Sequence, residues 1–367
     1  MRFTNATAWV SGWTLGFERD GRERLVVVSK ASYRLPRDGE TPQLLPQAVA
    51  LVTADVHHGD PATTAPLHET DFAQTKPGCD VLLVGSAWAR NGRPAPRVPV
   101  LLRVGRMEKM LTVTGPRQWQ GRWTGTQAGD PAPFVQQPFS YDQAFGGRQL
   151  AEDGQTAVGQ CDRNPVGVGF SLSPGQLDGQ PMPITEEVEH PITSARNDWR
   201  PMAFGPIGRH WLPRRQYGGT YDEAWQRARA PFWPDDFDDR YFQSAPPDQV
   251  IDPPSGNEEV VLQNLTPDGL RRFRLPETRV PVLFIPHRGR DYRMDARLDT
   301  VVFEPDAERF TLTWRATLPL ANSVFDVKEV IVGEMPQAWH RARRFPGKTY
   351  YASLGALVAQ RRRTGRL

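Results

Sequence analysis

Six residues with metal-binding side chains lie close together in the first quarter of the chain. They are His57, His58, Asp60, His68, Glu69 and Asp71. The surrounding stretch, residues 36–77, is rich in turn-forming residues and has no strand or helix pattern that would fix ligands in a metal geometry. We therefore expect neither a metal nor another cofactor.

A second candidate for chemistry is the acidic run DDFDD. Its carboxylates are those of Asp235, Asp236, Asp238 and Asp239. They could bind a hard cation, but the glycine turn typical of Asp-rich calcium loops is absent. We favour helix capping or ion pairs with Arg214, Arg215 and Arg240. Two of these carboxylates could also hydrolyse a glycoside, although the sequence singles out no pair.

Motifs of the common enzyme classes are missing. The sequence contains no nucleophile elbow, P-loop, dinucleotide fingerprint after a strand, or HExxH motif. His210 lies between Arg209 and Trp211, and no nucleophile that it could activate is nearby in the sequence. We interpret His210 as structural and expect a protein without catalytic residues.

Residues 197–240 concentrate aromatic, arginine and aspartate residues in a stretch rich in proline and glycine. Neither a helix nor a strand pattern fits it, and a long ordered loop is usually functional. Aromatic rings would hold such a loop, with arginine side chains bound to carboxylates or backbone carbonyls. The same residue types form binding hot spots when exposed. A buried scaffold and an exposed interface both remain open.

The predicted site combines this loop with an earlier segment, YDQAFGG, at residues 141–147. Its members serve either as partner-binding residues or as scaffold. They are Tyr141, Asp142, Phe145, Gly146, Gly147, Phe204, Gly205, Pro206, Arg209, Trp211, Arg214, Tyr221, Asp222 and Trp225.

The elements that position these residues are expected to be strands. The 35 prolines and 32 glycines among 367 residues indicate many turns and argue against a helix-rich fold. Apolar patterns predict strands in both halves of the chain. The predicted strands cover 25–35, 80–89, 97–105, 109–115, 280–285, 298–305, 309–319 and 327–332. The second to fourth of these would form an antiparallel meander.

We expect a mainly β fold with little helix, in which a long ordered Pro/Gly/Trp-rich loop region bridges two β-sandwich-like units. The predicted parts are an N-terminal β unit (1–128), the bridging region (129–254), a C-terminal β unit (255–340), and a short helix with a basic tail (341–367). The segments RVPVLL, from Arg97, and RVPVLF, from Arg279, resemble each other. This echo leaves an internal duplication open.

The composition and charge of the chain limit the compartment in which the protein is expected and the partners it is expected to bind. The 45 basic and 42 acidic residues give a net charge of +3, which makes no case for nucleic acid. No stretch approaches the ~20 apolar residues of a membrane span, and no signal peptide is evident. Cys79 and Cys161 have no metal or disulfide spacing, so we expect buried, reduced thiols. These features favour a cytoplasmic bacterial protein that binds neither nucleic acid nor membrane.

The chain resembles a bacterial family, domain of unknown function 2169, that is found in type VI secretion gene clusters. The matching segments follow the family's order across almost the whole chain. They are VVVSKASYRL, DFAQTKPGCDVLLVGSAWA, YDQAFGG, NPVGVGF, FGPIGRHWLPRR, GTYDEAW, PFWPDDFDDRYFQSAPPDQ, and LDTVVFEPD followed by TWR. The family's loading adaptors look like chaperones that help mount effectors with PAAR-like tips on the VgrG spike.

The resemblance implies a non-enzymatic adaptor or chaperone without established catalytic residues. Its expected partner is a type VI secretion effector with a PAAR-like region, and the VgrG spike is a further expected partner. Edge strands and the aromatic–arginine loop would hold this client, because strand addition shields a β-rich protein. The alternatives are a carbohydrate-active hydrolase that uses the aspartates of the DDFDD run, and a sugar-binding β-sandwich module that uses exposed tryptophans.

Overall fold

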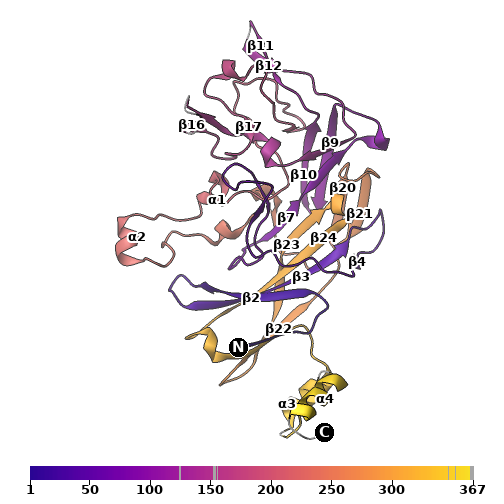
Figure 1. Cartoon of the computed structure of the whole chain (residues 1–367), viewed down its shortest axis with the longest axis vertical. Coiled ribbons are helices and arrows are strands. Elements are labelled where there is room, and N and C mark those ends of the chain that lie inside the picture. Colours follow the sequence, from indigo (N-terminus) through magenta and orange to yellow (C-terminus); the bar gives the residue numbers. More distant parts are fainter. Residues whose placement is uncertain (124, 152–153, 155, 346, 352, 364–367) are drawn as a thin grey trace.

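The structure is a computed structural model that describes the chain except residues 124, 152–153, 155, 346, 352 and 364–367 (Figure 1). Strands dominate it, and the four α-helices of the described part are short. The prediction of a mainly β fold with little helix is confirmed.

In the described part of the chain, the larger of the two main sheets has ten strands. They are β1 (Arg2–Asn5), β2 (Val10–Phe17), β3 (Glu23–Arg34), β4 (Gln43–Leu44), β7 (Cys79–Leu83), β19 (Val250–Ile251), β22 (Val280–Pro286), β23 (Tyr292–Glu304), β24 (Arg309–Pro319) and β25 (Val327–Val332). The main path runs β1-β25-β22-β23-β24-β3-β2, and β7, β19 and β4 branch from it. The sheet is barrel-like and nearly closed. Its end strands, β1 and β2, are joined by residues 6–9 alone.

The smaller sheet has five strands. They are β9 (Arg97–Val104), β10 (Met107–Thr114), β18 (Thr185–Glu186), β20 (Glu259–Gln263) and β21 (Leu270–Arg274). Their order is β18-β10-β9-β20-β21. Along β9 the alternate residues Val98, Val100 and Leu102 are buried, as expected for a strand with one face on the core.

One hydrophobic core lies between the two sheets. Phe273 of the smaller sheet packs against Phe310 of the larger sheet, with ring centroids 5.5 Å apart. Val100 and Leu102 belong to the same buried cluster as Val301 in β23. The two sheets therefore fold around a shared core.

Strand β3 is buried on both faces along nearly its whole length. Leu25 and Val27 face the core, whereas Lys30 faces a second buried layer and forms an ion pair with Asp71. In this outer layer Asp80 accepts hydrogen bonds from the Ser244 backbone N–H (2.8 Å) and from Lys76 (2.6 Å). These buried polar contacts fasten the loops before β7 and before β19 to the sheet.

The predicted meander is only partly correct. Strands β9 and β10 form the expected antiparallel hairpin. The stretch 80–89, however, divides at Val84 into β7 and β8 (Gly85–Trp88), and β7 pairs in parallel with β23 instead of joining β9. Every residue of β7 is buried, which suits a strand covered on both faces.

The strands of residues 1–128 and 255–340 share both sheets. Strand β9 pairs with β20, and β3 pairs with β24. The two expected sandwich-like units are therefore combined into one, because their strands complete each other's sheets. The echoed segments also differ in place: RVPVLL forms β9 in the smaller sheet and RVPVLF lies at β22 in the larger sheet. The duplication itself stays a prediction.

Short strand pairs occupy much of the chain between β4 and β19. They are β5 (Val56–His57) with β6 (Pro66–His68), β8 with β13 (Gln136–Phe139), β11 (Trp119–Arg122) with β12 (Gly125–Ala128), β14 (Phe145–Gly146) with β17 (Val168–Gly169), and β15 (Arg148–Leu150) with β16 (Ala157–Gln160). Cys79 and Cys161 are free and buried, as expected.

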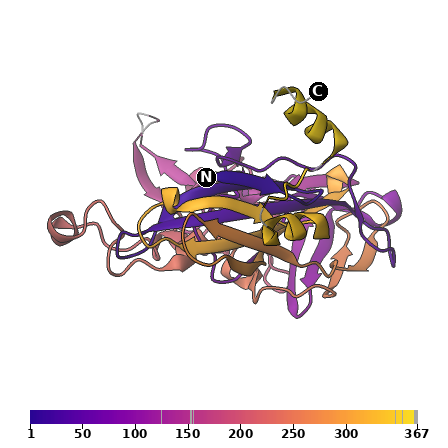
Figure 2. The ribbon, with the colours of Figure 1, turned by 90° about the horizontal axis from the view of Figure 1, so that it is seen from below.

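The helices are α1 (Leu212–Arg215), α2 (Glu223–Ala228), α3 (Gln337–Arg344) and α4 (Leu354–Arg363). The last of these confirms the helix predicted near the C-terminus. Figure 2 shows α4 standing apart from the sheets. No helix of the described chain is long and apolar enough to cross a membrane.

Candidate functional site

The aromatic–arginine stretch divides into a buried part and an exposed arm. Phe204, Trp211 and Arg214 are at most 5% exposed, whereas Tyr221 is 53% exposed. Figure 1 shows residues 217–233, which we name the α2 arm, extending away from both sheets. The first part is therefore packed as a scaffold would be, whereas the arm has the exposure that an interface requires.

Arg214 is the centre of the buried part. Its guanidinium donates to the carbonyl of Ile207 (2.9 Å), to the carbonyl of Tyr241 (2.8 Å) and to Oε1 of Glu69 (2.7 Å). These partners come from three separate segments, so one side chain fixes the loop in the absence of a strand ladder. Arg214 is a scaffold residue.

Aromatic contacts join the two predicted segments of the site. Trp211 packs edge-to-face on Tyr141, with ring centroids 5.4 Å apart. Phe204 packs in the same manner on Phe139, at 5.8 Å. The structure thus brings the segment around Tyr141 together with residues 204–214 of the predicted site.

Phe145, Gly146 and Gly147 are buried as well, and Phe145 packs in a separate cluster with Trp119 and Met182. Phe145 is buried, and β14 pairs in parallel with β17. Gly146 has a φ of 151°, and a Cβ there would lie 2.1 Å from the carbonyl oxygen of Asn164. Only glycine allows this close approach. These three residues are scaffold as well.

The α2 arm carries Tyr221, Asp222 and Trp225. Asp222 caps α2 by accepting a hydrogen bond from the Trp225 backbone N–H (2.8 Å). Tyr221 packs on Trp225 at 4.7 Å, and the Trp225 indole donates to the carbonyl of Phe232 (2.8 Å). Arg229 donates to the carbonyl of Arg19 and so ties the arm to the β2–β3 turn. The arm is internally ordered although it projects from the molecule.

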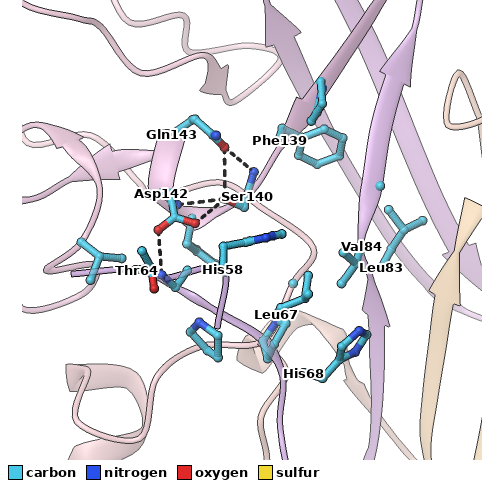
Figure 3. Close-up of a pocket in the computed structure, with 18 of the residues that line it drawn as sticks. His58, Thr64, Leu67, His68, Leu83, Val84, Phe139, Ser140, Asp142 and Gln143 are labelled. Atoms are coloured by element: carbon cyan, nitrogen blue, oxygen red, sulfur yellow. Dashed lines mark hydrogen bonds between the residues drawn. The ribbon is translucent and has the colours of Figure 1, made fainter. Parts of the chain in front are cut away.

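A cleft of about 690 Å3 opens beside the buried part (Figure 3). Four predicted site residues line it, namely Tyr141, Asp142, Gly205 and Pro206. The other walls come from residues 58–68, from the end of β7 and from residues 304–307. In Figure 3 the side chain of His58 extends toward the space between Ser140 and Leu67. The cleft is therefore assembled from segments that lie far apart in the sequence.

Hydrogen bonds fix Asp142 in the wall of this cleft. Its carboxylate accepts from the backbone N–H of Ala65 (2.7 Å) and from Oγ of Ser140 (2.8 Å). Ser140 also begins a short 3-10 turn, with Gln143 completing a capping box. Neutral donors thus orient the carboxylate.

At the opposite wall, His68 lies 3.5 Å from Glu304. Burial lowers the pKa of His68, and the nearby Glu304 carboxylate opposes this shift only in part. Glu304 itself accepts two hydrogen bonds from Arg309, both of 2.8 Å. His68 is accordingly neutral near pH 7, and the Glu304 charge is compensated by Arg309.

Arg209, Trp211 and Arg214 line a smaller hollow of about 290 Å3, which shares Thr64 and Pro66 with the cleft. Arg209 donates to Asp55 (3.1 Å) and lies 3.1 Å from Glu69. The pKa of Arg209 is raised, because the Glu69 and Asp55 charges outweigh the effect of burial. Within the described residues, no three His, Cys, Asp or Glu side chains are grouped to hold a metal.

Carboxylates of the acidic run make contacts within the loop itself. Asp238 caps a 3-10 turn and forms an ion pair with Arg240 (2.7 Å), as one of the favoured interpretations predicted. The pairing predicted for Arg214 and Arg215 is wrong. They bind Glu69 and Asp162 instead, because the loop folds back on distant segments.

The sequence interpretation missed the exposed edge strand β2. Trp13, Leu15 and Phe17 are 41%, 37% and 48% exposed. Their spacing of two residues could have indicated that the three side chains share one face of a strand. The position of β2 at the end of the sheet could not be predicted, because it depends on the order of the strands in the whole sheet.

A bacterial family described as "Uncharacterized protein conserved in bacteria (DUF2169)" matches residues 20–315. The chain belongs to this family. The DUF2169 match begins in the β2–β3 turn and ends within β24, so its limits do not follow the sheet, and it includes the cleft and the α2 arm. No curated protein and no solved structure matches the chain.

Proposed function

We propose that this DUF2169 protein is a non-enzymatic, cytoplasmic adaptor that binds a type VI secretion effector with a PAAR-like region and helps load it onto the VgrG spike. The resemblance of its motifs to the loading adaptors supports the secretion role. The open edge of β2 is the structural observation that carries the binding role.

Strand β2 ends the ten-stranded sheet and, among the residues that the structure describes, pairs only with β3. Next to the β2–β3 turn, the Glu18 backbone N–H donates to the carbonyl of Arg22. Hydrogen-bonded pairs alternate along an antiparallel ladder, so the N–H and C=O groups of Trp13 and Leu15 point away from β3. In agreement, the Phe17 N–H turns outward to the Gln74 side chain (3.2 Å). This edge has the geometry that accepts an additional strand.

The side chains beside this edge form an apolar strip. Trp13, Leu15 and Phe17 lie on one face of β2, and Phe17 meets Phe232 of the α2 arm with ring centroids 6.5 Å apart. Aromatic residues of this kind are enriched in binding hot spots. The edge would supply main-chain hydrogen bonds, while the strip would select the client's apolar side chains.

An extended segment of the client would therefore add antiparallel or parallel to β2. In strand addition, backbone hydrogen bonds provide affinity and alternate side chains provide specificity. A β-rich client gains protection by this mode, because its own unpaired edge is covered until it meets the spike. The α2 arm would contact the same client next to the added strand.

A tagged pull-down from the native host, with mass spectrometry of the bound proteins, tests this proposal. We expect one PAAR-like effector at near-stoichiometric yield. Leu15→Pro should abolish its recovery, because proline removes the outward N–H without removing a bond to β3. Recovery of no secretion component, in cells that express the gene cluster, would refute the adaptor role.

A sugar-binding module is the second candidate, and one observation favours it. Trp123 lies next to the β11–β12 turn and is 98% exposed. An exposed indole of this kind can stack on a sugar ring. Titration with oligosaccharides should then quench tryptophan fluorescence in the wild type and not in Trp123→Ala. No quenching with a broad sugar panel would remove this candidate.

A further inference from the structure

The cleft beside Tyr141 has an unusual balance of charge. Among the described residues, its lining includes the carboxylates of Asp142, Glu304 and Asp306 but no lysine or arginine. Glu304 is compensated by its two hydrogen bonds from Arg309. The charges of Asp142 and Asp306 are the ones available to a ligand.

Neutral groups hold both of these carboxylates. Asp142 accepts from Ala65 and Ser140, as described above. Asp306 accepts from Oγ of Ser86 (2.7 Å) and from the Trp88 indole (3.4 Å). Such donors orient a carboxylate without cancelling its charge. The cleft is therefore electronegative on two of its walls.

Apolar side chains make up much of the remaining lining, beside polar residues such as His58, Thr64 and Gln143. The apolar ones include Leu67, Val84, Phe139 and Pro206. His68, which also lines the cleft, is half-buried and neutral near pH 7 because burial lowers its pKa. Apolar walls that carry acidic groups suit a long aliphatic stem with a cationic end, which is the chemistry of a lysine or arginine side chain.

The size of the cleft indicates that this side chain belongs to a larger molecule. About 690 Å3 is typical of a pocket that takes a whole ligand, and it is more than one side chain fills. Residues 58–63 at its rim are mostly exposed, so the cleft is accessible to an extended chain. Its walls can contact the residues on either side of the basic one.

We infer that this cleft is a recognition site for a basic residue, lysine or arginine, within an extended segment of a partner polypeptide. It is a second binding site, separate from the β2 edge. The inference stands on the walls and charges of the cleft and does not depend on the adaptor role.

Saturation-transfer NMR with short peptides tests this site on the full-length protein. The probes are acetyl-Ala-Lys-Ala-amide and the same peptide with norleucine, which has the stem without the charge. We expect the lysine peptide to bind with a Kd about fivefold lower, a ratio in the range of two partly exposed charge pairs. The double variant Asp142→Asn/Asp306→Asn should lose this preference. The amide that replaces the Asp142 carboxylate keeps an oxygen that can accept from the Ala65 N–H.

Two controls keep the outcome clear. Asp130→Asn makes an acid-to-amide change at an exposed position outside the cleft lining, so it should retain the preference. Raising the salt from about 0.05 M to about 0.5 M should weaken lysine binding in the wild type, and this test needs no folded variant.

Three results would overturn the inference. They are equal binding of the two peptides to the wild type, a preference that survives in the folded double variant, and binding of n-butylamine as tight as that of the lysine peptide. The last result would make the cleft a site for simple amines.

Discussion

Arg214→Ala should destabilise the protein by about 3 kcal/mol, within the range for breaking a buried ion pair. The side chain is 3% exposed and donates to Ile207, Tyr241 and Glu69. Its removal leaves two backbone carbonyls without these donors, each a cost of roughly 1–3 kcal/mol when buried. The side chain of Glu69 is also buried (6% exposed), but Arg209 remains 3.1 Å from it. Because Arg209 can still compensate the Glu69 charge, we expect a loss of stability at the lower end of the range for a broken buried ion pair.

Urea unfolding followed by tryptophan fluorescence measures this change in the free energy of unfolding. Arg215→Ala is the matched control, because Arg215 is the next residue in the chain and its ion pair with Asp162 is half-exposed. It should cost less than about 1 kcal/mol. Glu69→Gln combined with Arg214→Ala should cost less than the sum of the single changes, because no buried charge is then left. Equal stability of Arg214→Ala and Arg215→Ala would refute the assignment of Arg214 as scaffold.

Three further predictions concern backbone space, pH and the arm. Gly146→Ala should lower the free energy of unfolding by roughly 2 kcal/mol or more, because its Cβ would clash with the Asn164 carbonyl. Gly205→Ala is the control. It has open space around it and should change the same quantity by less than about 0.5 kcal/mol in the same unfolding assay. Burial lowers the pKa of Lys109 from 10.5 to about 8, so the unfolded chain binds more protons between these values. The free energy of unfolding should then rise with pH across this window by about 3 kcal/mol, and Lys109→Met should remove that rise. Trp225→Ala should change the free energy of unfolding by less than about 1 kcal/mol, because the arm projects from the sheets. It should nevertheless weaken client capture in the pull-down. Unchanged capture would exclude the arm from the interface.

Local patterns in the sequence predicted most of the long strands. The β-branched run of β3 and the alternation in β9 are determined by burial within each strand, so a single segment carries the signal. The sharing of sheets depends on pairing between distant segments, such as β9 with β20, and no local pattern encodes it. For this reason the strands were predicted, whereas the sharing of both sheets between the two halves of the chain was not.

The candidate site shows the same division. The sequence listed Tyr141 and Trp211 in one candidate site by residue type, but it did not predict the contact between their rings, because that contact depends on how two distant segments pack. The cleft could not be predicted, since its walls come from segments more than 200 residues apart. The open edge at Leu15 also depends on the strand order of the whole sheet.

In the proposed binding mode, the client pairs with the open edge of β2. The most direct measurement compares the affinity of the captured effector for the wild type, Leu15→Ala and Leu15→Pro, with thermal unfolding to verify that each variant is folded. Both variants lose the leucine side chain, and only the proline variant loses the outward N–H. We expect Leu15→Pro to bind at least tenfold more weakly than Leu15→Ala, in keeping with the loss of one or more main-chain bonds at about 1 kcal/mol each and a displaced strand. Equal affinity of the two folded variants would contradict strand addition at β2.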